Sequence, residues 1–550
     1  MSAAVMDFEL PDGVVRELLD RVASDSPLSQ HLREAGAVRG RTVVGSRMFD
    51  GEALNTLYEI ARNSGERSLM FQLLALDNIH AAPRAREIPD LEKLINGLIA
   101  YLRRDAMDGW LYRRAPDGVL LPWLVTSMRH VVPTEGSPYV IVSLLANTMQ
   151  AAGNECQEDS RLRHTGMTMS IVVTGHDIIG RTIPELLAER GFFKECREFR
   201  EEYDAHLQRF RRMQGQFGKQ FLAGRAGFVS QPGGGLEYLR LPEHASVRCV
   251  NDEELLERRL DTRTDGAFWR EAGEAQGYDE IPVHGYLHLF HLELHRNMWV
   301  HVQNIEPYVY RPELREKLVL PDSHRDLVDI LTSDLDLFFD DIVEGKSGGR
   351  TVLCQGAPGL GKTLTAEVYA EAIGKPLYRV HSGQLGITAA SVEANLAQIL
   401  RRAARWEAIL LIDEADVYIR RRSNDLQHNA IVAEFLRTLE YFDGLMFMTT
   451  NRDDDVDDAI LSRCIAVIQY DTPPREAARR LWRTLSEQFG AALEEELVED
   501  LLNHYPRASG RDIKELLKLV LRFSMSRQEP PSLAMFATCA GFRGLTPVTG

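Results

Sequence analysis

Residues 356–363 have the composition and spacing of a phosphate-binding loop. They read Gly-Ala-Pro-Gly-Leu-Gly-Lys-Thr and match the pattern G-x-x-x-x-G-K-[ST]. Glycines lack a Cβ atom, so the backbone N–H groups of such a loop can come close to phosphate oxygens. The lysine of this pattern reaches the β- and γ-phosphates, and the threonine hydroxyl binds Mg²⁺. The residues predicted to bind a nucleoside triphosphate are Gly356, Ala357, Pro358, Gly359, Leu360, Gly361, Lys362, Thr363 and Leu364.

The segments on both sides of this loop favour a strand and a helix. Residues 351–354 read Thr-Val-Leu-Cys, which is typical of a short buried strand, and residues 364–373 contain neither Gly nor Pro. Strand, glycine-rich loop and helix is the setting in which the pattern binds phosphate. The N-terminal dipole of the helix adds to the attraction for phosphate. The sequence therefore predicts a nucleotide-binding α/β unit here.

A second group of residues with suitable chemistry follows an apolar run. Residues 408–412 read Ala-Ile-Leu-Leu-Ile, which is typical of a central parallel strand. Asp413 and Glu414 come directly after it, at the strand end where open α/β sheets bind ligands. We expect Asp413 to hold Mg²⁺ through water and Glu414 to orient or deprotonate the attacking water.

Three further polar residues occur in an order that suits the same site. Asn451 ends an apolar run at 445–450 and is placed to hydrogen-bond the attacking water or the γ-phosphate. Arg463 follows a short acidic, helix-like stretch and is a candidate arginine finger for the γ-phosphate bound by a neighbouring subunit. Arg511 stands at the start of a strongly helical segment, 514–525, and is placed to contact the nucleotide from a lid domain.

With these motifs in this order, residues 325–527 are similar to an AAA+ ATPase module. The motifs are GAPGLGKT, LLIDEAD, MFMTTN, LSRC and SGRDI. The resemblance implies ATP and Mg²⁺ as cofactors and a homo-oligomeric ring, often a hexamer, that remodels macromolecules. It also implies a backbone contribution to adenine binding from 338–343. The implied roles are Walker A at 356–363, Walker B at Asp413 and Glu414, sensor 1 at Asn451, an arginine finger at Arg463 and sensor 2 at Arg511.

The fold class implied is α/β, a P-loop NTPase parallel sheet with a small α-helical lid, preceded by a mixed α+β region. A chain of 550 residues suggests three or four domains. The expected divisions are a mainly helical domain at 1–150, an α+β segment at 151–230, a β-rich segment with a hairpin and connector at 231–322, the nucleotide-binding domain at 323–474, and the lid and C-terminal tail at 475–550.

Two departures from the family pattern bear on function. Many members that thread polypeptides carry an aromatic pore loop after the second strand, which here is expected at 377–380. The loop that follows contains Leu385, Gly386 and Ile387 and no aromatic residue. The tripeptide Ser-Arg-Cys around Arg463 is similar to the corresponding motif of clamp loaders. A function that depends on nucleic acid therefore stays open.

Composition limits the classes of partner. The formal net charge of −17 argues against a surface that binds polyanions overall, although local basic runs occur at 209–212 and 420–422. The six cysteines are scattered without a C-x-x-C pair, so a reducing compartment fits better than a disulfide framework. The first residues lack the pattern of a secretory signal, and no run approaches the roughly 18 apolar residues of a membrane span. We expect a cytoplasmic protein without a membrane partner.

The region before the module carries patterns of structure rather than of chemistry. Helical spacing occurs at 51–61, 90–104, 183–190 and 192–214, and 140–149 suits a buried element of either type. Alternation at 167–173 predicts a strand, 286–302 predicts a β-hairpin, and 231–235 predicts a turn. The five histidines between 284 and 301 alternate with apolar residues, which favours packing on strands over a metal site.

Three functions remain open at this point. The first is an ATP-hydrolysing ring that remodels a protein client bound through the N-terminal region. The second is a nucleic-acid-directed ATPase of clamp-loader or defence type. The third is a nucleotide-gated assembly scaffold with slow turnover, which the missing pore-loop aromatic favours.

Overall fold

The computed structural model describes most of the chain. The predicted adenine-side segment 338–343 and residues 232–235 of the predicted turn lie outside the described residues. The described residues are 7–34, 41–66, 69–70, 72–73, 76, 87–104, 107–149, 163–164, 166–224, 226–231, 236–240, 246–253, 258–259, 263, 269–271, 274–276, 278–332, 350–422, 424–440, 442–452, 455–491 and 493–548.

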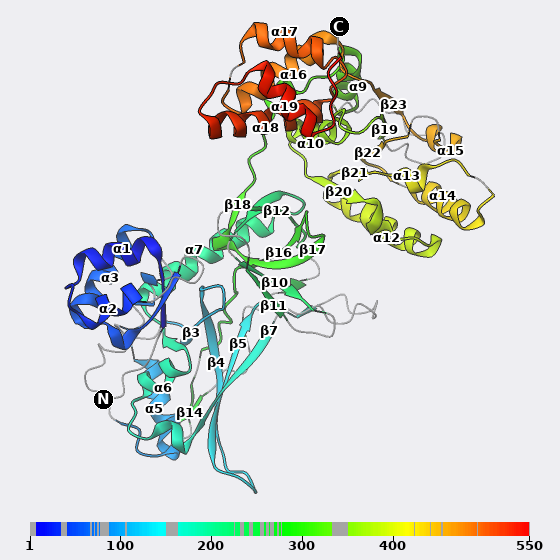
Figure 1. The fold of residues 1–550 in the computed structure, drawn as a ribbon. Coiled ribbons are helices and arrows are strands. Elements are labelled where there is room, and N and C mark those ends of the chain that lie inside the picture. The colour runs from blue at the N-terminus through cyan, green and yellow to red at the C-terminus, as the bar shows by residue number, and fades with distance from the viewer. Residues whose placement is uncertain are drawn as a thin grey trace.

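A small helical unit with a two-stranded antiparallel sheet opens the chain (Figure 1). The apolar faces of its helices and strands enclose one core, with Phe8, Leu18 and Leu57 fully buried in it. Asp50 caps the third helix by accepting a hydrogen bond from the Ala53 amide at 2.8 Å. The elements are β1 (Asp7–Pro11), α1 (Asp12–Arg21), α2 (Pro27–Glu34), β2 (Arg41–Gly45) and α3 (Gly51–Asn63).

The next unit is a five-stranded antiparallel sheet in the order β7-β5-β4-β3-β8, with α5 and α6 packed on it. The stretch 110–147, placed by the sequence analysis in a mainly helical domain, forms three of these strands. Residues 192–194, predicted as the start of a helix, are the edge strand β8. The elements are α5 (Leu91–Arg103), β3 (Trp110–Arg114), β4 (Leu120–Val131), β5 (Tyr139–Asn147), β7 (Gly166–Thr174), α6 (Ile183–Glu189) and β8 (Phe192–Lys194).

A seven-stranded antiparallel sheet follows, in the order β11-β10-β17-β16-β12-β9-β18, with α7 packed against it. The predicted hairpin is confirmed, because β16 and β17 pair from Tyr286↔His301 to His291↔Arg296. The elements are α7 (Arg197–Gln214), β9 (Gln220–Ala223), β10 (Ala226–Ser230), β11 (Leu236–Arg240), β12 (Val247–Asn251), β16 (Tyr286–His291), β17 (Arg296–His301) and β18 (Ile305–Pro307). Shorter strand pairs join β6 (Arg163–His164) to β13 (Arg258–Arg259) and β14 (Trp269–Glu271) to β15 (Glu274–Gln276).

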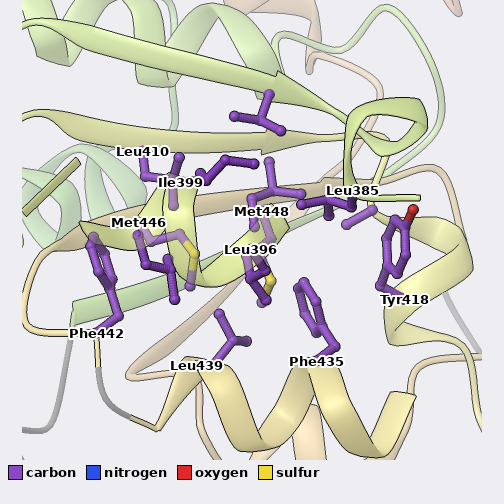
Figure 2. Packing of buried hydrophobic residues seen from close by; sticks show 14 of the residues in the cluster. Leu385, Leu396, Ile399, Leu410, Tyr418, Phe435, Leu439, Phe442, Met446 and Met448 are labelled. Carbon is purple, nitrogen blue, oxygen red and sulfur yellow. The ribbon is translucent and has the colours of Figure 1, made fainter. Parts of the chain in front are cut away.

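The C-terminal part contains a five-stranded parallel sheet in the order β20-β21-β22-β19-β23. Figure 2 shows Phe435 and Leu439 of α14 pointing toward Met446 and Met448 of β22. The elements are α8 (Leu314–Lys317), α9 (Asp322–Thr332), β19 (Arg350–Gly356), α10 (Lys362–Ile373), β20 (Leu377–His381), α11 (Ser382–Leu385), α12 (Ala389–Arg405), β21 (Ile409–Asp413), α13 (Asp416–Ile419), α14 (Leu426–Leu439), β22 (Leu445–Thr450), α15 (Asp458–Leu461) and β23 (Ala466–Tyr470).

Four helices after this sheet form the lid, which lies around the C-terminus in Figure 1. Their apolar faces meet around Trp482, Leu517 and Phe536, each fully buried. The helices are α16 (Arg475–Gln488), α17 (Glu495–His504), α18 (Gly510–Arg527) and α19 (Leu533–Phe542). The predicted fold class, a parallel P-loop sheet with a helical lid after a mixed α+β region, is thereby confirmed.

The β16–β17 hairpin packs directly on the parallel sheet unit. The Phe290 ring lies 5.5 Å from the Tyr378 ring and 5.0 Å from the Trp406 ring, measured between centroids. The Arg402 guanidinium covers the same phenylalanine at 4.3 Å. The indole N–H of Trp406 donates to Asp252 at 2.9 Å. The region before the module is therefore attached to β20 and α12 through a buried aromatic cluster.

Candidate nucleotide site

The phosphate-binding loop joins the end of β19 to the start of α10, the connection that the motif requires. Three of its glycines have positive φ angles, +139° at Gly356, +84° at Gly359 and +103° at Gly361, a region that side chains with a Cβ rarely adopt. The backbone therefore turns back on itself, and the N-terminal end of α10 follows at once. A phosphate bound in this loop lies at the positive end of the helix dipole.

Lys362 is the buried cation of the loop. Its Nζ donates to the carbonyl oxygens of Gly356 at 2.6 Å and Ala357 at 2.8 Å, and to Asn451 Oδ1 at 3.0 Å. The last contact connects the predicted phosphate cation with the predicted sensor on the neighbouring strand β22. These two residues are 89 positions apart in the chain, and the parallel sheet brings them together.

Asp413 ends β21 and is the most heavily hydrogen-bonded carboxylate of the site. Its Oδ1 accepts from Thr363 Oγ1 at 3.0 Å and from Thr449 Oγ1 at 2.6 Å. Its Oδ2 accepts from Arg379 Nη2 at 2.5 Å. Burial alone raises the pKa of Asp413, but the Thr449 hydrogen bond and the Arg379 charge outweigh it and lower that pKa below its ordinary value.

The arrangement of Thr363 and Asp413 fits a magnesium site. The threonine hydroxyl and the carboxylate are in direct contact at the start of α10. Mg²⁺ prefers hard oxygen ligands, commonly one or two from protein together with water and phosphate oxygens. The chemistry of this donor pair therefore suits the ion that accompanies a bound nucleotide.

Glu414 follows in a left-handed backbone conformation, with φ of +56°. A non-glycine residue in this region is uncommon and is often found at functional sites. Its amide donates to Thr449 Oγ1 at 3.0 Å, and this hydroxyl also donates to Asp413. Thr449 therefore fixes both acidic residues relative to β22, while the Glu414 side chain is exposed.

Asp416 also holds the end of β22 in place. Its Oδ1 accepts from the Asn451 amide at 3.3 Å and from the Thr450 hydroxyl. The end of β22 is thus tied to the start of α13, which follows the acidic pair. The position of Asn451 depends on these contacts as well as on Lys362.

The lid touches the phosphate-binding loop through its helix α18. The Arg511 amide donates to Gly359 O at 3.1 Å. A Cβ built on Gly359 would lie 2.9 Å from Arg511 Cβ and 2.9 Å from Ser509 Oγ. Ser509 caps α18, with Asp512 completing the capping box. The predicted sensor 2 residue is therefore adjacent to the loop through its backbone, while its side chain is exposed.

Arg463 lies apart from these groups in the same chain. It follows α15, and its guanidinium donates to Ala459 O at 3.2 Å and lies 3.9 Å from Glu440. These contacts are to the helix that precedes it, α15, and to the end of α14. The structure brings Lys362, Thr363, Asp413 and Asn451 together and leaves Arg463 outside that group.

The predicted pore-loop residues have different environments. Leu385 is 0% exposed and belongs to the core, as Figure 2 shows, whereas Ile387 is 88% exposed. The Tyr418 hydroxyl donates to the carbonyl oxygens of Ser382 at 2.6 Å and Gly386 at 2.7 Å, which holds this turn in place. Of these two, only Ile387 is available for contact with another molecule.

The basic run 420–422 is paired with acidic residues just before and at the start of α15. Arg420 lies 3.1 Å from Asp455, and Arg421 lies 3.2 Å from Asp458. Arg422 donates to Asp457 at 2.9 Å from its side chain and at 3.2 Å from its amide. These arginines therefore do not form an unpaired surface for nucleic acid.

Several site residues have no motif of their own. Arg379, Thr449 and Asp416 were not predicted, although the last two adjoin Asn451 and Glu414 within the recognised motifs. A hydroxyl one or two positions before a polar strand end is a usable signal, because it faces the same edge of the sheet. No local signal marks Arg379, whose partner is 34 residues away.

The comparisons with known proteins agree with this geometry. Residues 352–472 match the model of the ATPase family associated with various cellular activities (AAA). These residues form an AAA domain. Over 138 residues the chain is 34% identical to an uncharacterized AAA family ATPase of Sinorhizobium fredii, an alignment that covers 23% of this chain and 40% of that protein.

Further relatives are similar over comparable lengths. A 26S proteasome regulatory subunit 6B homolog of Dictyostelium discoideum is 26% identical over 221 residues, 38% of this chain and 51% of that protein. A mitochondrial sorting homolog of Caenorhabditis elegans is 32% identical over 187 residues, 31% of this chain and 53% of that protein. A chain in the solved structure of the E. coli MS115-1 HORMA:CdnC:Trip13 complex aligns over 44% of this chain and 94% of its own length, with 19% identity and a TM-score of 0.35. The chain thus spans about half the length of the curated relatives named here.

Within the described residues, no helix is both long and apolar enough to cross a lipid bilayer.

Proposed function

We propose that this protein is a Mg²⁺-dependent ATPase that works as a homo-oligomeric ring, an architecture in which Arg463 contacts a phosphate bound by the neighbouring subunit.

 We propose further that it remodels a protein client bound through the region before the AAA domain. The observation that carries the ATPase is the meeting of Lys362, Thr363, Asp413 and Asn451 at one edge of a parallel sheet. The match to the AAA ATPase family model and the similarity to its members support ATP hydrolysis as the reaction.

The roles in this proposal follow from position. Lys362 neutralises the β- and γ-phosphates, and Thr363 with Asp413 holds Mg²⁺, which when bound spreads the charge of the phosphates. Glu414 takes the proton of the attacking water, since its side chain is exposed at the strand end next to the metal-holding carboxylate. Asn451 orients that water, and Arg511 closes the lid over the nucleotide.

Glu414→Gln tests the hydrolytic role. The change keeps the shape of the side chain and removes the base, so phosphate release from Mg-ATP should fall to background while nucleotide binding is spared. Equal turnover by wild type and Glu414→Gln would refute the assignment.

The ring is supported by the placement of Arg463. In its own chain this residue contacts α15 and lies near Glu440, so its proposed phosphate belongs to a neighbouring subunit. A head-to-tail ring provides the heterologous interface that such a composite site needs. An arginine finger raises the rate of turnover by about 10³-fold or more.

Mixing two inactive variants tests the composite site. Arg463→Ala retains an intact phosphate site, and Lys362→Ala retains an intact finger. Mixed oligomers place some intact sites beside intact fingers, so part of the activity should return. If mixed oligomers form and no activity returns, the proposed role of Arg463 in trans is wrong.

The nucleotide-gated scaffold remains the second candidate, and one observation favours it. Ile387 is the exposed apolar residue of the loop at 385–387, where threading proteins carry an aromatic residue. Ile387→Ala separates the two candidates: lost client processing with unchanged ATP turnover supports work in the central pore. Unchanged client processing favours the scaffold.

We place the protein in the cytoplasm, in keeping with its cysteines. Cys196, Cys249, Cys354, Cys464 and Cys539 are free thiols in the described part of the chain. Free thiols are typical of reducing compartments. Fractionation of cells that express the protein would test the location.

A further inference from the structure

Arg379 is a second cation at the proposed magnesium site. It lies on β20, the strand at the edge of the parallel sheet, next to β21 that carries Asp413. One guanidinium nitrogen, Nη2, lies 2.5 Å from Asp413 Oδ2, and Nη1 lies 3.5 Å from Glu367 Oε1 on α10. Arg379 therefore bridges the carboxylate of the proposed metal site and a carboxylate on the helix that follows the phosphate-binding loop.

The two oxygens of Asp413 are both engaged in these contacts. Thr363 and Thr449 donate to Oδ1, and Arg379 donates to Oδ2. A metal ion, or a water molecule bound to it, needs an oxygen of the same carboxylate. A guanidinium hydrogen-bonded to that carboxylate neutralises part of its charge, so the arginine and the metal compete for it.

The exposure of the two side chains indicates which one moves. Asp413 is 6% exposed and is held by hydroxyl groups on α10 and β22, whereas Arg379 is 40% exposed. The Arg379 side chain can therefore turn toward solvent and still form an ion pair with Glu367. Glu367 itself is on the surface, so this alternative pairing has little cost.

We propose that Arg379 is a positioning residue that competes with Mg²⁺ for Asp413 and so sets the Mg²⁺ concentration at which the nucleotide site fills. The inference rests on the proposed function, because it requires a nucleotide site that uses Mg²⁺. When the metal is absent, Arg379 keeps the buried carboxylate paired and in place. When Mg²⁺ enters with a nucleotide, Arg379 leaves Asp413 for Glu367 or solvent.

The test is a Mg²⁺ titration of nucleotide binding, without turnover. Wild type and variants are saturated with a fluorescent N-methylanthraniloyl ADP, and the fluorescence change is followed as Mg²⁺ is added. Affinity for the same nucleotide in EDTA is measured separately, so that a general loss of phosphate binding is seen there. An opposite charge within hydrogen-bond distance lowers a carboxylate's affinity for a proton by about tenfold or more, and we expect an effect of the same order on its affinity for Mg²⁺.

Three variants make the result specific. Arg379→Met should lower the half-saturating Mg²⁺ concentration by about tenfold, for the electrostatic reason above. Arg379→Lys keeps the charge and should restore a requirement close to that of the wild type. Lys375→Met removes one positive charge two residues before β20, where the lysine faces Glu407 at 3.9 Å, and should leave the requirement unchanged.

An equal or higher Mg²⁺ requirement in Arg379→Met would overturn the inference, as would an equal shift in Lys375→Met. In either case, retained binding of the nucleotide leaves the proposed function standing. Absence of nucleotide binding by the wild type, with or without Mg²⁺, would instead overturn the proposed function and this inference with it.

Discussion

Replacing Gly359 with alanine should separate the lid from the phosphate-binding loop. Gly359 has a φ of +84°, and its carbonyl accepts a hydrogen bond from the Arg511 amide at 3.1 Å. A Cβ at this position would lie 2.9 Å from both Arg511 Cβ and Ser509 Oγ. Arg511 Cβ is fixed by the backbone of α18, and Ser509 Oγ is held by its hydrogen bonds with Asp512, so α18 must move away from the loop.

The free-energy cost of Gly359→Ala has three contributions. An alanine in the left-handed region costs about 1–2 kcal/mol, and overpacking a tight contact costs about 1–3 kcal/mol. The loss of one hydrogen bond adds about 1 kcal/mol. The strain acts on the loop itself, whereas the overpacking and the lost hydrogen bond act on the contact with the lid.

Hydrogen exchange at the Arg511 amide reports this contact directly. Arg511 is in the first turn of α18, where amides have no partner within the helix, and its acceptor is Gly359 O. The overpacking and the lost hydrogen bond together weaken the contact by about 2–4 kcal/mol, which should raise the exchange rate of this amide by a factor of about 30–900. Amides later in α18, such as that of Leu517, should keep their protection.

Gly361→Ala is the matched control. Gly361 is in the same loop with a φ of +103°, but a Cβ there would meet no atom within 4 Å. This variant should therefore show the strain in its unfolding temperature and leave protection of the Arg511 amide unchanged. If both variants expose that amide equally, or if Gly359→Ala leaves it protected, the reasoning from the lid contact is wrong.

Three further changes have defined expected outcomes. Lys362→Ala should lower nucleotide affinity by at least about tenfold in calorimetry, because the buried cation of the loop is lost; unchanged affinity would contradict the phosphate-loop assignment. Burial raises the pKa of Asp457, but hydrogen bonds, above all the one from Arg422, outweigh burial and lower this pKa below its ordinary value of 3.8. These hydrogen bonds therefore stabilise the folded state above pH 3.8, and the stabilisation is lost as the pH falls further. Asp457→Asn should therefore lower the unfolding temperature at pH 7, and its difference from wild type should shrink as the pH falls below 3.8; a pH-independent difference would refute the pairing. Trp406→Phe should cost about 1 kcal/mol in chemical denaturation through the lost hydrogen bond to Asp252, and wild-type stability would show that this contact contributes nothing.

The parts of the fold that the sequence predicts well are those with a local signal. The glycine loop, the acidic strand end and the helix at 514–525 each depend on residues adjacent in the chain, and each has the expected element around it. The strands at 110–147 lack such a signal, because their apolar runs suit either a helix or a buried strand. Their type is decided by pairing with partners far along the chain, as between Leu111 and Lys194.

Leu385 shows the same limit at a single residue. Its sequence neighbours suggest an exposed loop, yet α11 turns its side chain into the core between the sheet and α12. The hydroxyl of Tyr418, 32 residues from Gly386, holds that turn. No sequence pattern around Leu385 indicates that its side chain is buried. Ile387, which follows the turn, is exposed, as expected for a residue of a surface loop.

Asp413 illustrates why motif residues can be predicted while their chemistry cannot. Its type and its place at a strand end are visible in the sequence, but its acidity and its affinity for a cation depend on groups from α10, β20 and β22. The strand order β20-β21-β22 puts Arg379 on one side of the carboxylate and Thr449 on the other. These neighbours oppose the effect of burial and keep the group ionised, which is the form of a carboxyl group that binds Mg²⁺. The same order makes one of them a competitor of the metal, so the strength of the site is a property of the sheet as much as of the motif.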